Sequence, residues 1–330
     1  MKQALGRFVF LAVNAEKEAG PELAKQFGIM GYPTYVVLDG DGAVLDRWAG
    51  YDKPSWLGST EAVLADPVTV EARRARFEKS PTAPDAARLA MVLDSQDQYV
   101  EALALYREAQ RLNLDPAKDY LMRIFVANFY GARQDAIPLE EVTKAADALL
   151  ASPKAKPAEL ADVAYLMVIT ARGAKRPEMA APYLEAAVKR TEGSTDPEVQ
   201  RSRRDILPDY ALLVLRDGAK ARDYKRAAMP EGWMTDPDQL NRYAWWCFEN
   251  RLDLEEAHEL ARKGAELAKP GRERAMILDT LAEVCNALGN RAEALTHARS
   301  ALAEDPQGKT YAEQVERFSK PQDPAPQDER

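Results

Sequence analysis

Two different patterns of apolar and polar positions divide this chain near residue 85. Before that point, short apolar runs alternate with turn residues, which is typical of strands and hairpins. Strands are predicted over residues 8–13, 35–38 and 43–50, and helices over 21–29, 53–64 and 68–79. Beyond residue 85 the apolar positions recur with helical spacing. The sequence therefore predicts a small α/β module followed by an all-α region.

The all-α region contains repeated helix pairs. They are predicted at 85–94 with 99–112, 119–130 with 139–150, 158–171 with 177–191, 198–215 with 219–227, 240–248 with 254–267, and 281–287 with 291–305. In the last copy, Ala294, Ala298 and Ala301 line one face of the second helix, where small side chains let helices approach closely. These positions resemble the tetratricopeptide repeat. The resemblance implies a helical solenoid whose concave surface holds a peptide or protein partner.

The α/β module carries two turn motifs. Residues 31–34 (Gly-Tyr-Pro-Thr) separate two apolar runs, and residues 39–42 (Asp-Gly-Asp-Gly) predict a tight hairpin. A calcium loop is the alternative for the acidic stretch, but the further acidic ligands of an EF-hand are missing. The two motifs, together with Gly50 after the next strand, resemble the second half of a thioredoxin fold.

The thioredoxin resemblance implies a cis peptide bond before Pro33. It also implies that Tyr32, Pro33 and Thr34 form a peptide-binding loop, because an extended substrate pairs with the backbone at this place in the family. The family's paired cysteines would lie before Met1, and the chain contains no Cys-x-x-Cys. We therefore expect no redox catalysis from this chain. The alternative is that it is the downstream part of a thioredoxin-family thiol–disulfide oxidoreductase.

The absence of the cysteine-bearing central strand poses a physical problem for this module. Each buried backbone group left unpaired costs about 1–3 kcal/mol, against a domain stability of about 5–15 kcal/mol. The favoured expectation is that residues 8–13 pair directly with 35–38. There are two alternatives. Either another chain supplies the missing strand, or the module is ordered only locally and packs against the first helix pair for support.

The expected fold class is therefore α+β. An incomplete thioredoxin-like module is predicted over 1–66, a connecting helix and linker over 67–84, tetratricopeptide-like repeats over 85–318, and a disordered tail over 319–330. Pro81 and Pro84 mark the linker, since prolines in a stretch without apolar periodicity interrupt regular structure.

Composition narrows the class of partner. The chain has 45 basic and 53 acidic residues in 330, a net charge of −8, which argues against nucleic-acid binding. No apolar run approaches the ~20 residues of a membrane span, and the N-terminus lacks the pattern of a signal peptide. These features predict a cytoplasmic protein, or a periplasmic or exported one if the chain begins further upstream.

Few residues are candidates for chemistry. Cys247 and Cys285 lie in apolar helical segments and are expected to be buried, reduced thiols, with a disulfide as the alternative. His258 and His297, the only histidines, are expected on polar helix faces, and no metal-ligand spacing is present. No catalytic residue, cofactor or metal site is therefore predicted.

An aromatic cluster at Tyr243 and Trp246 has two interpretations, core packing or contact with a partner on the solenoid surface. With the repeat pattern, it leads to one functional expectation. The chain is expected to be a non-catalytic binding or scaffold protein whose partner is a protein or peptide.

Overall fold

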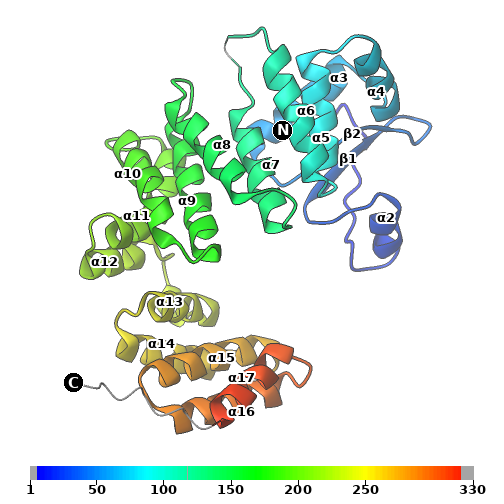
Figure 1. The fold of residues 1–330 in the computed structure, drawn as a ribbon. Coiled ribbons are helices and arrows are strands. Elements are labelled where there is room, and N and C mark those ends of the chain that lie inside the picture. The colour runs from blue at the N-terminus through cyan, green and yellow to red at the C-terminus, as the bar shows by residue number, and fades with distance from the viewer. Residues whose placement is uncertain (1–5, 117, 321–330) are drawn as a thin grey trace. The chain divides into compact units, whose positions relative to one another are not determined.

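The computed structural model describes residues 6–116 and 118–320 (Figure 1). The chain forms two compact units, unit 1 over Met1–Ser202 and unit 2 over Arg203–Arg330. Their boundary falls inside helix α11 (Pro197–Leu213). Among the described residues, no helix is both long and apolar enough to cross a lipid bilayer.

Unit 1 begins with the α/β module. Its elements are α2 (Gly20–Gln26), β1 (Thr34–Leu38), β2 (Val44–Ala49), α3 (Lys53–Ala65) and α4 (Val70–Lys79). The two strands are antiparallel, with Tyr35 opposite Trp48. Between them, the Asp39 carboxylate accepts hydrogen bonds from the Asp41 and Ala43 backbone N–H groups at 2.9 and 2.8 Å. The predicted hairpin is therefore confirmed.

The predicted strand over residues 8–13 is wrong. Residues 9–14 adopt no regular secondary structure, and the side chains of Val9, Leu11 and Val13 are exposed. Within the described chain, β1 pairs with β2 alone. Apolar composition suggested a strand, but a strand needs a partner edge, and this segment does not reach β1.

Helix pairs make up the rest of unit 1. They are α5 (Ala83–Asp94), α6 (Tyr99–Leu112), α7 (Leu121–Arg133), α8 (Leu139–Ala151), α9 (Pro157–Gly173) and α10 (Ala181–Arg190), the last preceded by a 3-10 turn, η1 (Pro177–Ala180). Consecutive helices pack together, and α7 also contacts α9. The closest approaches are made at small residues, since Ala86, Ala90, Ala102 and Ala109 are fully buried.

Buried polar contacts attach the α/β module to the first helix pair. Asp46 of β2 pairs with Arg88 of α5, with 2.7 Å between Oδ2 and Nη1. Arg73 of α4 pairs with Asp85 at the start of α5, with 2.9 Å between Nη1 and Oδ1. The predicted linker at 80–84 is thus a tight connection inside unit 1. The packing of β2 against α5 fits the alternative in which the module leans on the first pair.

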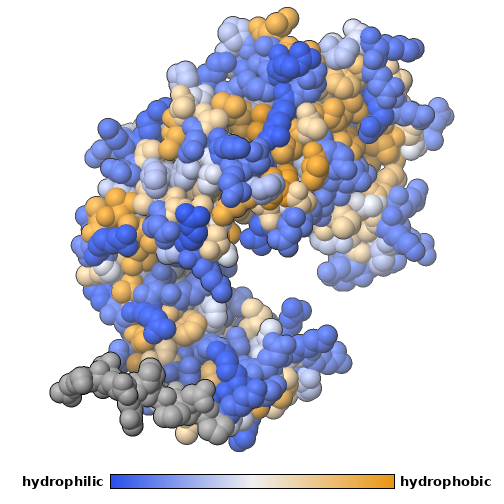
Figure 2. All heavy atoms as spheres, in the orientation of Figure 1, coloured by the Kyte–Doolittle hydropathy of each residue, from blue (hydrophilic) through white to orange (hydrophobic). Residues whose placement is uncertain are grey.

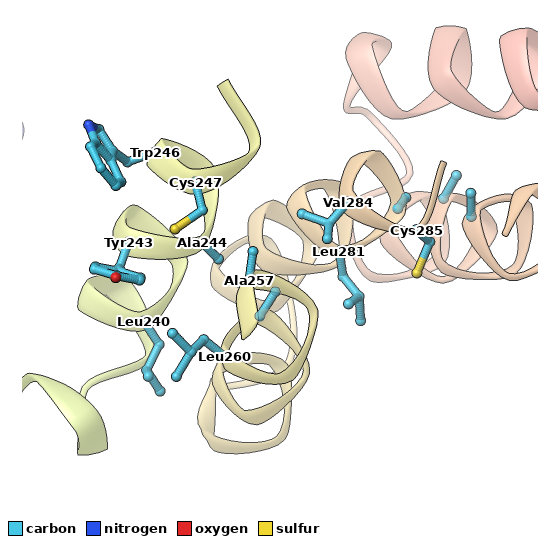
Figure 3. Close-up of a cluster of buried hydrophobic side chains, with 14 of the residues drawn as sticks. Leu240, Tyr243, Ala244, Trp246, Cys247, Ala257, Leu260, Leu281, Val284 and Cys285 are labelled. Atoms are coloured by element: carbon cyan, nitrogen blue, oxygen red, sulfur yellow. The ribbon is translucent and has the colours of Figure 1, made fainter. Parts of the chain in front are cut away.

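Unit 2 is entirely helical in its described part. Beyond α11 it contains α12 (Gly218–Ala228), a 3-10 turn η2 (Trp233–Thr235), α13 (Pro237–Asn250), α14 (Leu254–Leu267), α15 (Arg272–Ala287), α16 (Arg291–Glu304) and α17 (Lys309–Ser319). Its core gathers Leu240, Tyr243 and Cys247 of α13 with Leu260 of α14 and Leu281 of α15 (Figure 3).

Helices are present at all six predicted pairs, and most of their ends lie within a few residues of those expected, although α15 begins at Arg272, well before residue 281. Helix α17 was not predicted as a separate element. The predicted disordered tail lies outside the described residues, apart from Ser319, which ends α17, and Lys320.

Candidate functional site

The loop before β1 has the backbone conformation that the thioredoxin resemblance implies. The Tyr32–Pro33 peptide bond is cis. The Pro33 carbonyl accepts a hydrogen bond from the Gly50 backbone N–H at 2.8 Å, and the Thr34 hydroxyl donates to the Gly31 carbonyl at 2.6 Å. Tyr32 is 67% exposed at the tip of this loop. The loop is therefore held from both sides while one aromatic side chain stays open to a partner.

The outer edge of β1 continues from this loop. Pro33 and Gly50 form a hydrogen-bonded pair, and such pairs alternate along an antiparallel ladder. Thr34 and Val36 consequently direct their N–H and C=O groups away from β2. In the described chain no second strand takes up these groups. An edge of this kind can receive an extended peptide.

A cavity of about 230 Å³ lies beside the end of β2, and its lining includes Gly50, whose N–H donates to the Pro33 carbonyl. Its walls come from the end of β2 and the connection to α3, from α3 itself, and from α5 and α7. The lining residues are Trp48, Ala49, Gly50, Tyr51, Asp52, Ser55, Trp56, Ser59, Met91, Asp94 and Arg123.

Aromatic rings form the back wall of this cavity. The Trp48 ring stacks on Tyr35 with 5.5 Å between centroids, and Trp56 meets Tyr35 edge-on at 6.2 Å. Trp48 Nε1 is buried without a hydrogen-bond partner among the described residues. A buried donor without a partner costs about 1–3 kcal/mol.

Three charged residues line the cavity, namely Asp52 before α3, Asp94 on α5 and Arg123 on α7. Burial raises the pKa of Asp94, although the positive charge of Arg123 opposes the rise. The Asp94 carboxylate accepts only a long hydrogen bond, 3.5 Å, from the Tyr106 hydroxyl. Arg123 is exposed and forms no ion pair within the described residues. Sequence reasoning missed Asp94 and Arg123, because they are 29 positions apart on separate helices and belong to no motif.

A second, larger hollow of about 600 Å³ lies among the helices of unit 1. It is formed by the end of α7, the α7–α8 connection and the end of α9. Phe129, Ile137, Leu139 and Ile169 give it mostly apolar walls, and Arg133 lies at its margin. Apolar residues also reach the surface between hydrophilic ones over the helices of unit 1 in Figure 2.

The predicted partner contact at Tyr243 and Trp246 is not exposed. Tyr243 is fully buried and Trp246 is 6% exposed, in the core drawn in Figure 3. The Tyr243 hydroxyl accepts a hydrogen bond from Arg226 Nε at 3.0 Å, which satisfies its polar atom inside the unit. Core packing, the other interpretation of this cluster, therefore fits the structure.

The cysteines do not form a redox site. Both are free and buried, as predicted. Burial raises the pKa of each thiol to about 12, opposite to the lowered value of a reactive cysteine. In the described chain, one group of side chains with metal-ligating atoms converges, namely His258, Cys285 and Glu293 in unit 2. The histidines are partly buried rather than on the open surface that we expected.

Comparison with known proteins adds little to the geometry. No protein-family profile and no curated protein matches this chain. Among solved structures, it is similar to the TPR protein YrrB with an unusual peptide-binding site (17% identity, 74% of this chain and 98% of that one, TM-score 0.39). It is also similar to PilF of Pseudomonas aeruginosa (15%, 70% and 95%, 0.43). A third is a tetratricopeptide repeat protein from Parabacteroides merdae (14%, 76% and 91%, 0.47).

The helical-repeat architecture is shown by the packed helix pairs of this structure.

Proposed function

We propose that this chain is a non-catalytic peptide-binding protein. In this proposal a thioredoxin-like α/β module offers the cis-proline loop and the aromatic cavity beside it, and the tetratricopeptide-like helix pairs serve as scaffold. The ligand is an extended peptide that carries a large apolar side chain next to an acidic group.

The observation that carries the proposal is a cavity lined by the aromatic side chains of Trp48 and Trp56 together with Arg123. Aromatic walls favour an apolar side chain, because burying one contributes about 1.5–3 kcal/mol. The Arg123 guanidinium suits a carboxylate, which it can bind through two parallel hydrogen bonds.

The outer edge of β1 supports the same ligand class. Thr34 and Val36 present backbone donors and acceptors in the spacing of a strand. The exposed Tyr32 at the loop tip offers a further aromatic contact.

Disulfide exchange is not favoured by any described residue. It requires an accessible thiolate, and Cys247 and Cys285 are both buried. We expect no insulin reduction by this chain above the rate of a variant that lacks both cysteines.

The test is selection of peptides on the full-length chain by phage display, followed by fluorescence anisotropy of a labelled selected peptide. Two variants address the cavity. Ser55→Trp fills it from an exposed position at the start of α3, and Arg123→Gln removes the guanidinium. We expect each to weaken binding about tenfold or more, which corresponds to about 1.4 kcal/mol.

Arg74→Gln is the matched control, because Arg74 is also an exposed arginine of unit 1 but lies on α4 away from the cavity. It should bind the peptide as the unmodified chain does. Selected peptides that bind Ser55→Trp and Arg123→Gln with unchanged affinity would show that the cavity is not the binding site.

A further inference from the structure

Three helices of unit 2 bring metal-ligating atoms to one place. His258 lies on α14, Cys285 on α15 and Glu293 on α16. One nitrogen, one sulfur and one oxygen atom from these side chains all lie within 4.8 Å of one another. The chain has two histidines and two cysteines in 330 residues, so this cluster contains half of each. Sequence spacing could not reveal it, because the ligands come from three separate helices.

The distance between the nitrogen and the oxygen of this cluster matches that between two ligands of a single metal ion. With bonds of about 2.0–2.3 Å, the ligand atoms of a tetrahedral zinc site lie roughly 3.3–3.8 Å apart. His258 Nε2 lies 3.3 Å from Glu293 Oε1. His297, one turn further along α16, places its Nε2 at 3.6 Å from the same oxygen. Two imidazole nitrogens therefore lie close to the same Glu293 oxygen.

A second carboxylate orients His258. Glu259 Oε1 lies 3.4 Å from His258 Nδ1, on the side of the ring away from Glu293. In metal sites, a ligating histidine commonly donates its other N–H to a carboxylate, which fixes the tautomer and strengthens the ligand. The Nδ1–H would then donate to Glu259, and the Nε2 lone pair would face Cys285 and Glu293.

The three proposed ligands differ in solvent exposure, and this difference leaves a path for an ion from solvent to the buried sulfur. Cys285 is fully buried, whereas the Glu293 side chain is 45% exposed. An ion can therefore enter from the Glu293 side and reach the sulfur.

We propose that His258, Cys285 and Glu293 bind a divalent transition-metal ion of the zinc class, with His297 contacting Glu293 and positioning it. Thiolate and imidazole donors select such ions over Mg²⁺ or Ca²⁺, which take oxygen ligands. Binding breaks the Cys285 S–H bond, forms a sulfur–metal bond and releases the proton to solvent. The ion would join α14, α15 and α16 and stabilise unit 2.

The experiment uses the full-length chain stripped with EDTA and titrated with Co²⁺, followed by displacement with Zn²⁺. A cobalt–thiolate charge-transfer band that saturates at one equivalent is expected. Cys285→Ala should abolish the band, and Cys247→Ala, an equally buried cysteine on α13, should retain it. His297→Gln should retain the band but weaken metal binding by about 10–100-fold.

His258→Gln is a second test that does not depend on the folding of the Cys285→Ala variant, because His258 is only partly buried. It should fold, as judged by circular dichroism, and should bind Co²⁺ at least tenfold more weakly. In a parallel measurement, Zn²⁺ should raise the Tm of the unmodified chain and of Cys247→Ala, but not that of His258→Gln. The absence of a thiolate band in the unmodified chain, or a band that survives in Cys285→Ala, would overturn the proposal.

Discussion

Arg47 of β2 is buried against Ser95 at the end of α5, with its Nε donating to the Ser95 hydroxyl at 2.7 Å. The same guanidinium donates to the Ser95 carbonyl at 3.2 Å, and to the Phe27 and Gly28 carbonyls at 2.5 and 3.2 Å. One side chain therefore connects the hairpin, the end of α2 and the first helix pair. Burial lowers the pKa of Arg47, and the polar contacts compensate for that burial.

Replacement of Arg47 should loosen the α/β module. Arg47→Met leaves the Ser95, Phe27 and Gly28 acceptors without their donor, and we expect a loss of about 3 kcal/mol in the free energy of unfolding. Hydrogen–deuterium exchange should show faster exchange in peptides from β1, β2 and α2. Arg74→Met, an exposed arginine on α4, is the control and should change exchange little. Unchanged protection in Arg47→Met would mean that the hairpin does not depend on this contact.

Stability of the α4–α5 junction should fall in acid. Hydrogen bonds from Arg76 and Arg73 hold the pKa of Asp66 at about 2. Burial alone would raise the pKa of Asp85, but the same arginines outweigh it and lower the pKa. A carboxyl whose folded pKa is lowered stabilises the fold above its unfolded pKa, and this contribution is lost as pH falls from about 4 to about 2.

The matched pair Asp85→Asn and Asp66→Asn tests this network by urea unfolding at a series of pH values. The Asp85 side chain is 4% exposed and that of Asp66 is 39% exposed. We expect Asp85→Asn to cost about 3 kcal/mol at neutral pH, since it leaves the buried Arg73 with a weaker partner. Asp66→Asn should cost less than about 1 kcal/mol, because solvent screens its pairs. Equal costs for the two variants would contradict this assignment.

Asp279 should have the opposite pH dependence. Burial, and then the negative charge of Glu283, raise its pKa to about 6, although Arg317 and Gln314 partly oppose the rise. The folded state then binds a proton more tightly than the unfolded state, so stability falls as pH rises from about 4 to about 6. Asp279→Asn should remove this dependence.

At pH 7 we expect Asp279→Asn to raise the free energy of unfolding by about 1–2 kcal/mol. This value is reduced because the residue is only half-buried and solvent screens its charge. Thermal unfolding between pH 4 and pH 7 gives the measurement. If Asp279→Asn were less stable than the unmodified chain at pH 7, the ionised Asp279 carboxylate would stabilise the folded state, which contradicts this prediction.

The two interpretations of Trp246 predict different defects. As a core residue, Trp246→Ala should lower the free energy of unfolding by about 3–5 kcal/mol. Trp245 lies next to it in sequence but is only partly buried, so Trp245→Ala should have a smaller effect on urea unfolding. If Trp246 were instead a partner contact, its replacement would leave stability unchanged and affect only peptide binding.

Local sequence patterns were sufficient to predict most elements of this chain. The helix pairs and the hairpin at Asp39 follow from signals within a few residues, whereas the cis bond at Pro33 was implied by the resemblance to the thioredoxin family. The helix pairs show a period of small and apolar side chains, and the hairpin has a glycine with positive φ at Gly42. Such signals act over short stretches, so they can be read without knowing the partner of each segment.

Contacts between distant segments were decided only by the tertiary structure. Residues 8–13 have strand-like composition but no partner edge, so they form no strand. Asp94 and Arg123 meet at a cavity, and His258, Cys285 and Glu293 converge, because helix packing brings separate turns together. The physical reason is that helix propensity and turn chemistry are local, whereas pairing and side-chain convergence depend on the relative placement of elements, which no single stretch of sequence specifies.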